Sequence, residues 1–163
     1  MTDARRDAAY AVRRAGPSDG AAVTRELAAY LDFLGEAPDL AGLDYDVAHW
    51  EEVYAGARGA FLLVVAPDGV AVGTAAVRVL EPGVAEIKRM WLRPAHRGRG
   101  LGRRLMDACL GEARRLRCPV VRLDSEARLE AALHLYRAYG FTEIPDYNGN
   151  PLAQVWMERR EAP

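Results

Sequence analysis

Residues 97–102 read Arg-Gly-Arg-Gly-Leu-Gly and separate two segments of different character. Residues 84–92 before them are rich in Ile, Met, Trp and Leu and lead into Arg93-Pro94, as a strand that ends at a turn would. Residues 101–117 after them contain no proline and carry apolar residues at helical spacing. A glycine-rich turn that opens a helix gathers unpaired N–H groups at the positive end of the helix dipole. The stretch therefore predicts a site for a phosphate or pyrophosphate.

The rest of the chain alternates strand-like and helix-like segments around this turn. Turn signals at Pro17-Ser18-Asp19-Gly20, Pro67-Asp68-Gly69 and Glu81-Pro82-Gly83 set several of the boundaries. The expected strands cover residues 10–14, 60–66, 70–80, 84–92, 120–124, 141–144 and 154–158. The expected helices cover residues 21–34, 44–54, 100–117 and 127–139, the last ended by Gly140. This order predicts an α/β fold with a mixed sheet.

Length and composition limit the class of protein. The 163 residues fit one domain, 1–163, with half of the residues hydrophobic and 28 % charged. No apolar run approaches the roughly 20 residues of a membrane span, and the N-terminus lacks a secretory signal, so we expect a cytoplasmic protein with no membrane partner. Cys109 and Cys118 have neither disulfide nor metal-ligand spacing, which predicts no metal site and a buried, inert thiol at Cys109.

Charge is distributed unevenly along the chain, although the net charge is −1. Residues 88–104 contain seven Lys or Arg residues and no acid, whereas residues 26–57 contain eight acids and no Lys or Arg. The first segment is suited to an anion, and the second either faces a cation or is a solvated acidic surface. Aromatic side chains that could stack bases are not interleaved with the arginines, so we expect no nucleic acid partner.

Two common phosphate-binding motifs do not fit the turn. The dinucleotide fingerprint Gly-x-Gly-x-x-Gly requires a third glycine where Gly98 and Gly100 are followed by Arg103, and where Gly100 and Gly102 are followed by Leu105. The P-loop requires Gly-Lys-Ser/Thr, which is absent. Both motifs also usually open a fold with a βαβ unit, whereas three consecutive strands are expected before this turn.

The pattern Arg97-x-x-Gly100-x-Gly102 resembles motif A of the GNAT superfamily of N-acetyltransferases, Gln/Arg-x-x-Gly-x-Gly/Ala. Residues 85–106 resemble that family's fourth strand, turn and third helix without a gap. Residues 129–141 are similar to its later motif Ala-x-x-Leu-Tyr-x-x-x-Gly-Phe. The resemblance covers about residues 9–160. It implies a mixed sheet of six to seven strands with about four helices, splayed between the fourth and fifth strands.

The resemblance also implies that acetyl-CoA is the co-substrate and that its pyrophosphate lies in the glycine turn. The pantetheine arm would hydrogen-bond to the exposed edge of the fourth strand, and the N–H of Leu92 would stabilise the thioester oxyanion. The implied cofactor-binding residues are Met90, Leu92, Arg97, Gly98, Arg99, Gly100, Leu101, Gly102 and Arg103. One departure is Leu129, because many members have an asparagine there that contacts the pantetheine.

Two catalytic residues follow from the same resemblance. Tyr136 matches the tyrosine that protonates the leaving thiolate, with a packed core tyrosine as the alternative. Glu86 occupies a position where some members place the general base, acting directly or through water. It could instead bind a cationic substrate or pair with Lys88 or Arg89.

The first two helices and the loop between the last two strands wall the acceptor site in this family. The implied substrate-binding residues are Tyr30, Phe33, His49, Trp50 and Tyr147. The expected reaction is direct acetyl transfer in a ternary complex to a primary amine, such as a polyamine, an amino sugar or a basic side chain of a peptide. The alternatives are a catalytically silent acyl-CoA sensor and a protein lysine or N-terminal acetyltransferase, and the resemblance allows a homodimer.

Overall fold

The computed structural model of the chain describes residues 9–162. The strands are β1 (Ala11–Arg14), β2 (Gly59–Val65), β3 (Ala71–Glu81), β4 (Val84–Leu92), β5 (Val120–Ser125), β6 (Thr142–Ile144) and β7 (Val155–Arg160). The α-helices are α2 (Gly20–Leu34), α3 (Tyr45–Ala48), α4 (Trp50–Val53), α5 (Leu101–Arg115) and α6 (Glu130–Ala138). Three 3-10 turns accompany them, η1 (Pro17–Asp19), η2 (Gly56–Arg58) and η3 (Pro94–His96).

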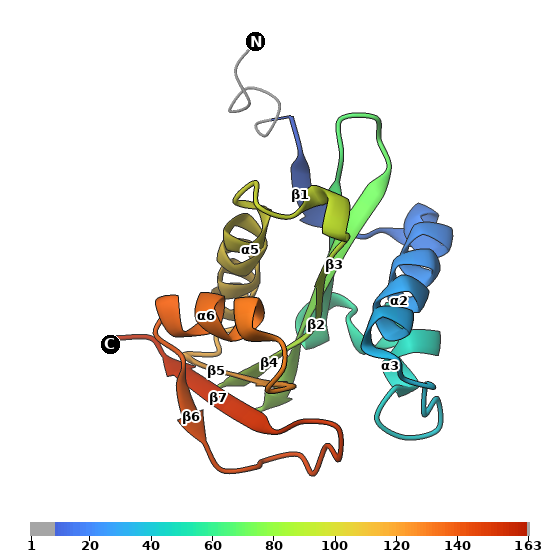
Figure 1. The fold of residues 1–163 in the computed structure, drawn as a ribbon. Helices are drawn as coiled ribbons and strands as arrows, with labels where there is room; N and C mark the ends of the chain where they lie inside the picture. Colours follow the sequence, from blue (N-terminus) through green and yellow to red (C-terminus); the bar gives the residue numbers. More distant parts are fainter. Residues whose placement is uncertain (1–8, 163) are drawn as a thin grey trace.

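The seven strands form one mixed sheet in the order β1-β2-β3-β4-β5-β7-β6. β4 and β5 are parallel, and every other neighbouring pair is antiparallel. Helices α2 and α3 cover one face of the sheet, and α5 and α6 cover the other (Figure 1). The predicted α/β architecture with a mixed sheet is confirmed.

The sheet opens in its middle, between β4 and β5. Residues 84–86 of β4 pair with residues 120–122 of β5. Beyond these pairs the strands diverge, and residues 123–125 of β5 pair with β7 alone. The predicted splay between the fourth and fifth strands is therefore confirmed, and it leaves one edge of β4 open from Ile87 to Leu92.

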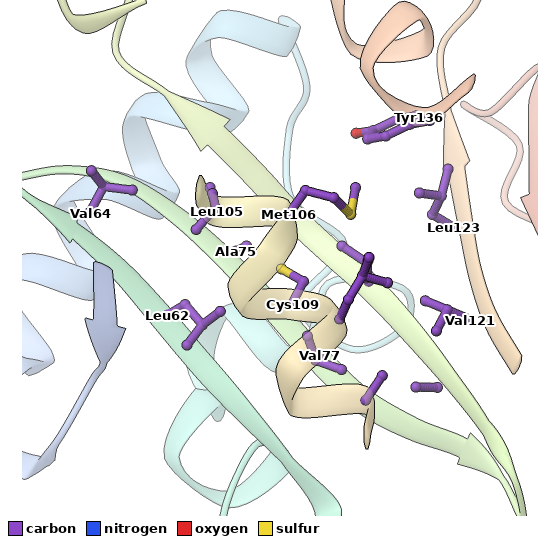
Figure 2. Packing of buried hydrophobic residues seen from close by; sticks show 14 of the residues in the cluster. Leu62, Val64, Ala75, Val77, Leu105, Met106, Cys109, Val121, Leu123 and Tyr136 are labelled. Atoms are coloured by element: carbon purple, nitrogen blue, oxygen red, sulfur yellow. The ribbon is translucent and has the colours of Figure 1, made fainter. Parts of the chain in front are cut away.

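Two hydrophobic clusters hold the helices against the sheet. The larger cluster lies under α5 and α6 and includes Leu105, Met106 and Cys109, which follow one another at helical spacing (Figure 2). The smaller cluster packs Val23 and Leu27 of α2 against β2 and β3. Each helix buries one apolar stripe against the sheet, so both faces of the sheet are covered.

The predicted helix over residues 44–54 is wrong in one respect, because it divides at His49 into α3 and α4. The backbone of His49 leaves the helical region, with φ −128° and ψ 30°. The break allows the Tyr54 hydroxyl to donate to Asp46 Oδ2 at 2.6 Å while both side chains stay buried. Tertiary contacts here outweigh local helix propensity. The helix expected from residue 127 also begins later, at Glu130.

Candidate functional site

A cleft of about 590 Å³ lies at the splay of the sheet. β4 and β5 form its floor, α6 and the end of α2 form two walls, and the loops at residues 36–44 and 148–153 close its rim. Ligands in open α/β sheets bind where neighbouring strands diverge, so this cleft is the natural place for a reaction.

The glycine turn at one end of β4 has the backbone that the sequence predicts. Gly98 and Gly100 have φ values of +75° and +73°, in the left-handed region that favours glycine. The first turn of α5 presents the N–H groups of Leu101, Gly102 and Arg103, which have no carbonyl one turn earlier to bond. The turn therefore offers several N–H donors and positive charge to an anion.

The open edge of β4 presents main-chain groups to the splay. The N–H of Arg93 donates to Val72 on β3 at 2.9 Å. Main-chain groups alternate in direction along a strand, so the N–H groups of Leu92 and Met90 face the opposite side. That side is the edge that diverges from β5. These two residues are therefore placed to bond an extended ligand, as the predicted pantetheine contacts require.

A β-bulge lies in β4 next to this edge. Ala76 pairs with Lys88 and Thr74 with Trp91, so β4 has one more residue than β3 between the two pairs. Arg89 adopts φ +57°, and Thr74 Oγ1 donates to its carbonyl oxygen at 2.7 Å. The bulge breaks the alternation of the strand, so that two successive cations, Lys88 and Arg89, both reach the loop at Leu43.

Arg89 forms a buried ion pair that holds this loop. Its guanidinium donates to Asp44 at 2.8 Å and to Asp46 at 2.6 Å, and all three side chains are at least 89 % buried. Burial alone would lower the pKa of Arg89, but its hydrogen bonds to Asp46 raise that pKa above the ordinary value. Arg93 and the fully buried Glu26 form a second pair at 2.9 Å.

These pairs change the interpretation of the two charged segments. The basic residues 88–104 and the acidic residues 26–57 pair with each other in part, whereas the sequence pattern predicted an anion for one and a cation for the other. Arg89 and Arg93 thus neutralise three of the acids across the interface between β4 and the helical layer that contains α2 and α3.

The carboxylates that do line the cleft come from two parts of the chain. Glu36 and Asp39 follow α2, whereas Asp124 and Glu126 lie at the end of β5. Burial raises the pKa of Glu36, and the nearby Glu126 carboxylate raises it further. Asp124 and Glu126 were missed in the sequence. Their position at the carboxyl end of a strand beside the expected splay is the signal that could have identified them.

Tyr136 lies on α6 and lines the cleft, with its ring in the larger hydrophobic cluster beside Met106 and Leu123 (Figure 2). Burial raises its pKa above the ordinary value for tyrosine. Its hydroxyl makes no hydrogen bond to another residue within 9–162. Tyr136 is thus both a core residue and a protonated hydroxyl at the cleft. Leu129, at the start of the same helix, also lines the cleft.

Glu86 is buried beside the cleft, and both of its carboxylate oxygens are occupied. Arg78 forms an ion pair with Oε1 at 2.7 Å, and the Tyr147 hydroxyl donates to Oε2 at 2.8 Å. Asn148 also reaches Oε2, at 3.5 Å, and donates to Asp124 at 2.6 Å. The expected partners Lys88 and Arg89 are therefore replaced by Arg78. Glu86 fastens the loop between β6 and β7 to the sheet.

Of the five predicted acceptor residues, Tyr30 alone is among the described residues that line the cleft, whereas Tyr147 bonds Glu86 beside it. Tyr30 lines the cleft, and burial raises its pKa to about 12. Phe33 packs against Trp91 with a ring-centroid distance of 5.0 Å, and the Arg97 guanidinium lies 4.9 Å from the Phe33 ring centroid. The structure does not bring His49 or Trp50 to the cleft.

His49 stacks on Tyr45 at 3.9 Å, and Trp50 packs against Phe61 at the edge of a separate pocket of about 330 Å³. His49 lies at the break between α3 and α4, and Trp50 is the first residue of α4. The family resemblance had placed both residues on the acceptor side.

Three further observations concern other sequence predictions. No group of three or more His, Cys, Asp or Glu side chains within residues 9–162 is arranged to hold a metal ion. In the same part of the chain, no helix is both long enough and apolar enough to cross a membrane. Cys109 is fully buried, and burial raises the pKa of its thiol, as expected for an inert core cysteine.

Comparisons with known proteins agree with this geometry. The model of the Acetyltransferase (GNAT) family matches residues 26–141. An uncharacterized N-acetyltransferase of Schizosaccharomyces pombe is 30 % identical over 133 residues, which cover 81 % of this chain and 82 % of that protein.

Two solved structures have the same fold. An acetyltransferase of the GNAT family from Staphylococcus aureus superimposes with a TM-score of 0.81 at 16 % identity, covering 93 % of this chain and 98 % of that chain. The structure of yncA from Salmonella typhimurium with its cofactor acetyl-CoA superimposes with a TM-score of 0.74 at 25 % identity, covering 93 % and 94 %.

Proposed function

Because the chain belongs to the GNAT family and is an N-acetyltransferase, we propose that it transfers an acetyl group from acetyl-CoA to the primary amine of a small cationic molecule in the cytoplasm. One observation carries the proposal. The glycine turn, the open edge of β4 and the Tyr136 side chain all border the splay of one sheet. In this arrangement the glycine turn suits the pyrophosphate of acetyl-CoA, the strand edge suits its pantetheine arm, and the buried phenol suits its thioester.

The residues that would hold acetyl-CoA follow from their positions. The N–H groups from Gly98 to Arg103 would receive the pyrophosphate, and the main chain of Met90 and Leu92 would bond the pantetheine arm. When bound, acetyl-CoA supplies the activated acetyl group. The backbone N–H of Leu92 faces the splay, where it would stabilise negative charge on the thioester oxygen.

The reaction needs one group that donates a proton to the leaving thiolate and another that accepts a proton from the attacking amine. Tyr136 is protonated at neutral pH, as an ordinary tyrosine is, and burial raises its pKa further. Its hydroxyl has a proton that it would donate to the departing thiolate. The attacking amine must lose a proton as the new C–N bond forms. Glu86 contacts the cleft through Asn148, which lines it, so we propose that Glu86 accepts this proton through water rather than directly.

The charges at the cleft rim support an amine acceptor. Glu36, Asp39, Asp124 and Glu126 line the cleft and would attract an ammonium group. Burial and the neighbouring Glu126 raise the pKa of Glu36, and a bound cation would relieve that repulsion. Of the acidic segment predicted for the acceptor side, Glu36, Asp39 and the Arg89-paired Asp44 line the cleft, and Asp124 and Glu126 add to them from the end of β5.

An amine panel tests the proposed activity. We expect release of free thiol from acetyl-CoA in the presence of diamines, polyamines, amino sugars or basic amino acids, and slower release with peptides. Calorimetry should show acetyl-CoA binding without an acceptor. Binding without turnover on any amine would favour the silent sensor instead, and absence of acetyl-CoA binding would overturn both assignments.

We expect Gly100→Val to weaken acetyl-CoA binding by about 10-fold or more. Gly100 has φ +73°, and the left-handed region costs a residue with a Cβ roughly 1–2 kcal/mol, most for a β-branched one. The turn would relax and lose the alignment of its N–H groups. Titration calorimetry with CoA measures the change.

Gly111→Ala in the same helix is the matched control. Its Cβ would meet no atom within 4 Å, so the variant should bind CoA normally and gain about 0.5–1 kcal/mol in stability. Equal affinities for Gly100→Val and the control would show that the turn does not hold the cofactor.

A further inference from the structure

The chain contains a single lysine, Lys88, among 22 basic Lys and Arg residues. It lies on β4 at the bulge and lines the cleft, next to the edge that presents Met90 and Leu92. Since arginine supplies the positive charge everywhere else, Lys88 is the one compact ammonium among the side chains of this protein.

The surroundings of Lys88 leave its charge without a carboxylate partner. Its ammonium donates to the Leu43 carbonyl oxygen at 3.3 Å, and it forms no ion pair with a carboxylate within residues 9–162. The two arginines beside it are committed elsewhere, Arg78 to Glu86 and Arg89 to Asp44 and Asp46. Burial lowers the pKa of Lys88, and the charges of Asp46 and Glu86, neither of which is at ion-pair distance, raise it by less.

We propose that Lys88 is a specificity-determining residue that binds a carboxylate, or an equivalent anionic group, of the acceptor. This inference rests on the proposed acetyl transfer and narrows its substrate class. The ammonium has three N–H donors and the structure uses one for Leu43, so an anion beside Lys88 would take the two that remain. Burial removes part of the hydration of the Lys88 ammonium, and an anionic partner would compensate for that loss.

Carboxylates that line the same cleft complete the recognition. Glu36 and Glu126, the latter also paired with Arg128, approach each other, and Asp124 lies at the end of β5. These carboxylates suit an ammonium, whereas Lys88 suits a carboxylate. An acceptor with both groups is a zwitterion of the amino-acid type, and a basic or diamino acid fits both the acidic rim and the single cation.

The test compares acceptors that differ in one carboxylate. Ornithine is paired with putrescine, and lysine with cadaverine, each amine being the decarboxylated amino acid. We expect kcat/KM to favour the amino acid by about 10- to 100-fold, the range for one charge-assisted hydrogen bond. Lys88→Met should abolish this preference by raising KM for the amino acids, and Lys88→Arg should retain most of it.

A second measurement does not depend on turnover. Because Lys88 is the only lysine, reductive methylation followed by mass spectrometry reports on one side chain and the N-terminal amine. In the presence of CoA, ornithine should slow methylation of Lys88 more than putrescine does, while the N-terminal amine serves as the internal reference.

The outcomes separate this inference from the proposed activity. If both members of each pair are acetylated equally well, or if Lys88→Met changes both equally, Lys88 only holds the Leu43 loop and the inference is wrong. Equal protection by ornithine and putrescine would overturn it as well. If no amine is acetylated but ornithine still protects Lys88, the proposed activity fails while the anion site stands.

Discussion

Replacement of Tyr136 by phenylalanine is expected to lower kcat by a factor of at least about 100, the lower end of the range for a general acid. The hydroxyl lies at the cleft, is protonated at neutral pH with a pKa that burial raises further, and has no hydrogen-bond partner within residues 9–162. Removing the Tyr136 hydroxyl therefore deprives no other described polar group of a hydrogen bond. We expect the free energy of unfolding and the affinity for acetyl-CoA to change little, so that the loss appears in kcat.

Tyr139→Phe is the matched control for this variant. Tyr139 follows the same helix, but its hydroxyl donates to Asp107 at 2.7 Å and to the Arg103 carbonyl at 3.1 Å, away from the cleft. This variant should keep its kcat and lose a little stability. Steady-state turnover with the best amine, together with calorimetry, measures both. An unchanged kcat in Tyr136→Phe would remove the phenol from the mechanism and leave it a core residue.

The sequence predicted those features that depend on neighbours along the chain. The positive φ values of Gly98 and Gly100 follow from a turn that only glycine adopts without strain, and the apolar stripe of α5 follows from helical spacing. The hairpin at Pro67-Asp68-Gly69 and the strand over 84–92 are equally local. The splay of the sheet came from the family resemblance rather than from periodicity.

Long-range charge pairing could not be predicted in the same way. Arg89 and Asp46 are separated by 43 residues, and nothing in either segment indicates that they meet. The bulge that brings Lys88 and Arg89 to one face adds one residue to β4, and a shift of one residue in a strand reverses the side of every later side chain.

The prediction of the acceptor site was the least accurate, because that site depends on contacts between residues far apart in the sequence. The family resemblance placed His49 and Trp50 at the acceptor site, but the helix expected to carry them divides at His49, where Tyr54 and Asp46 form a buried hydrogen bond. The strand that ends near Asp124 was predicted, but nothing local in the sequence indicates that Asp124 and Glu126 face the same cleft as the loop after α2. A site on loops is built by contacts across the fold, whereas a site on a glycine turn is built by its own backbone.

The second large effect is expected for Arg89→Met, which should lower the free energy of unfolding by about 3–5 kcal/mol. The substitution keeps much of the side-chain volume but leaves the carboxylates of Asp44 and Asp46, only 11 % and 3 % exposed, without their cation. Both amino acids have a Cβ, so the cost of φ +57° at this position is unchanged. Urea unfolding with a constant m value measures the loss.

Arg137→Met is the control, because Arg137 and Glu143 form an exposed ion pair at 3.0 Å with side chains 56 % and 61 % exposed. Such a pair contributes at most about 1 kcal/mol. Arg89 also fixes the loop at Leu43 and Asp44 that borders the cleft, so the Arg89→Met protein that remains folded should show a higher KM for the amine and an unchanged affinity for acetyl-CoA. Similar losses of stability in the two variants would mean that the buried pair is no stronger than a surface pair, and that the acceptor loop is held by its other contacts.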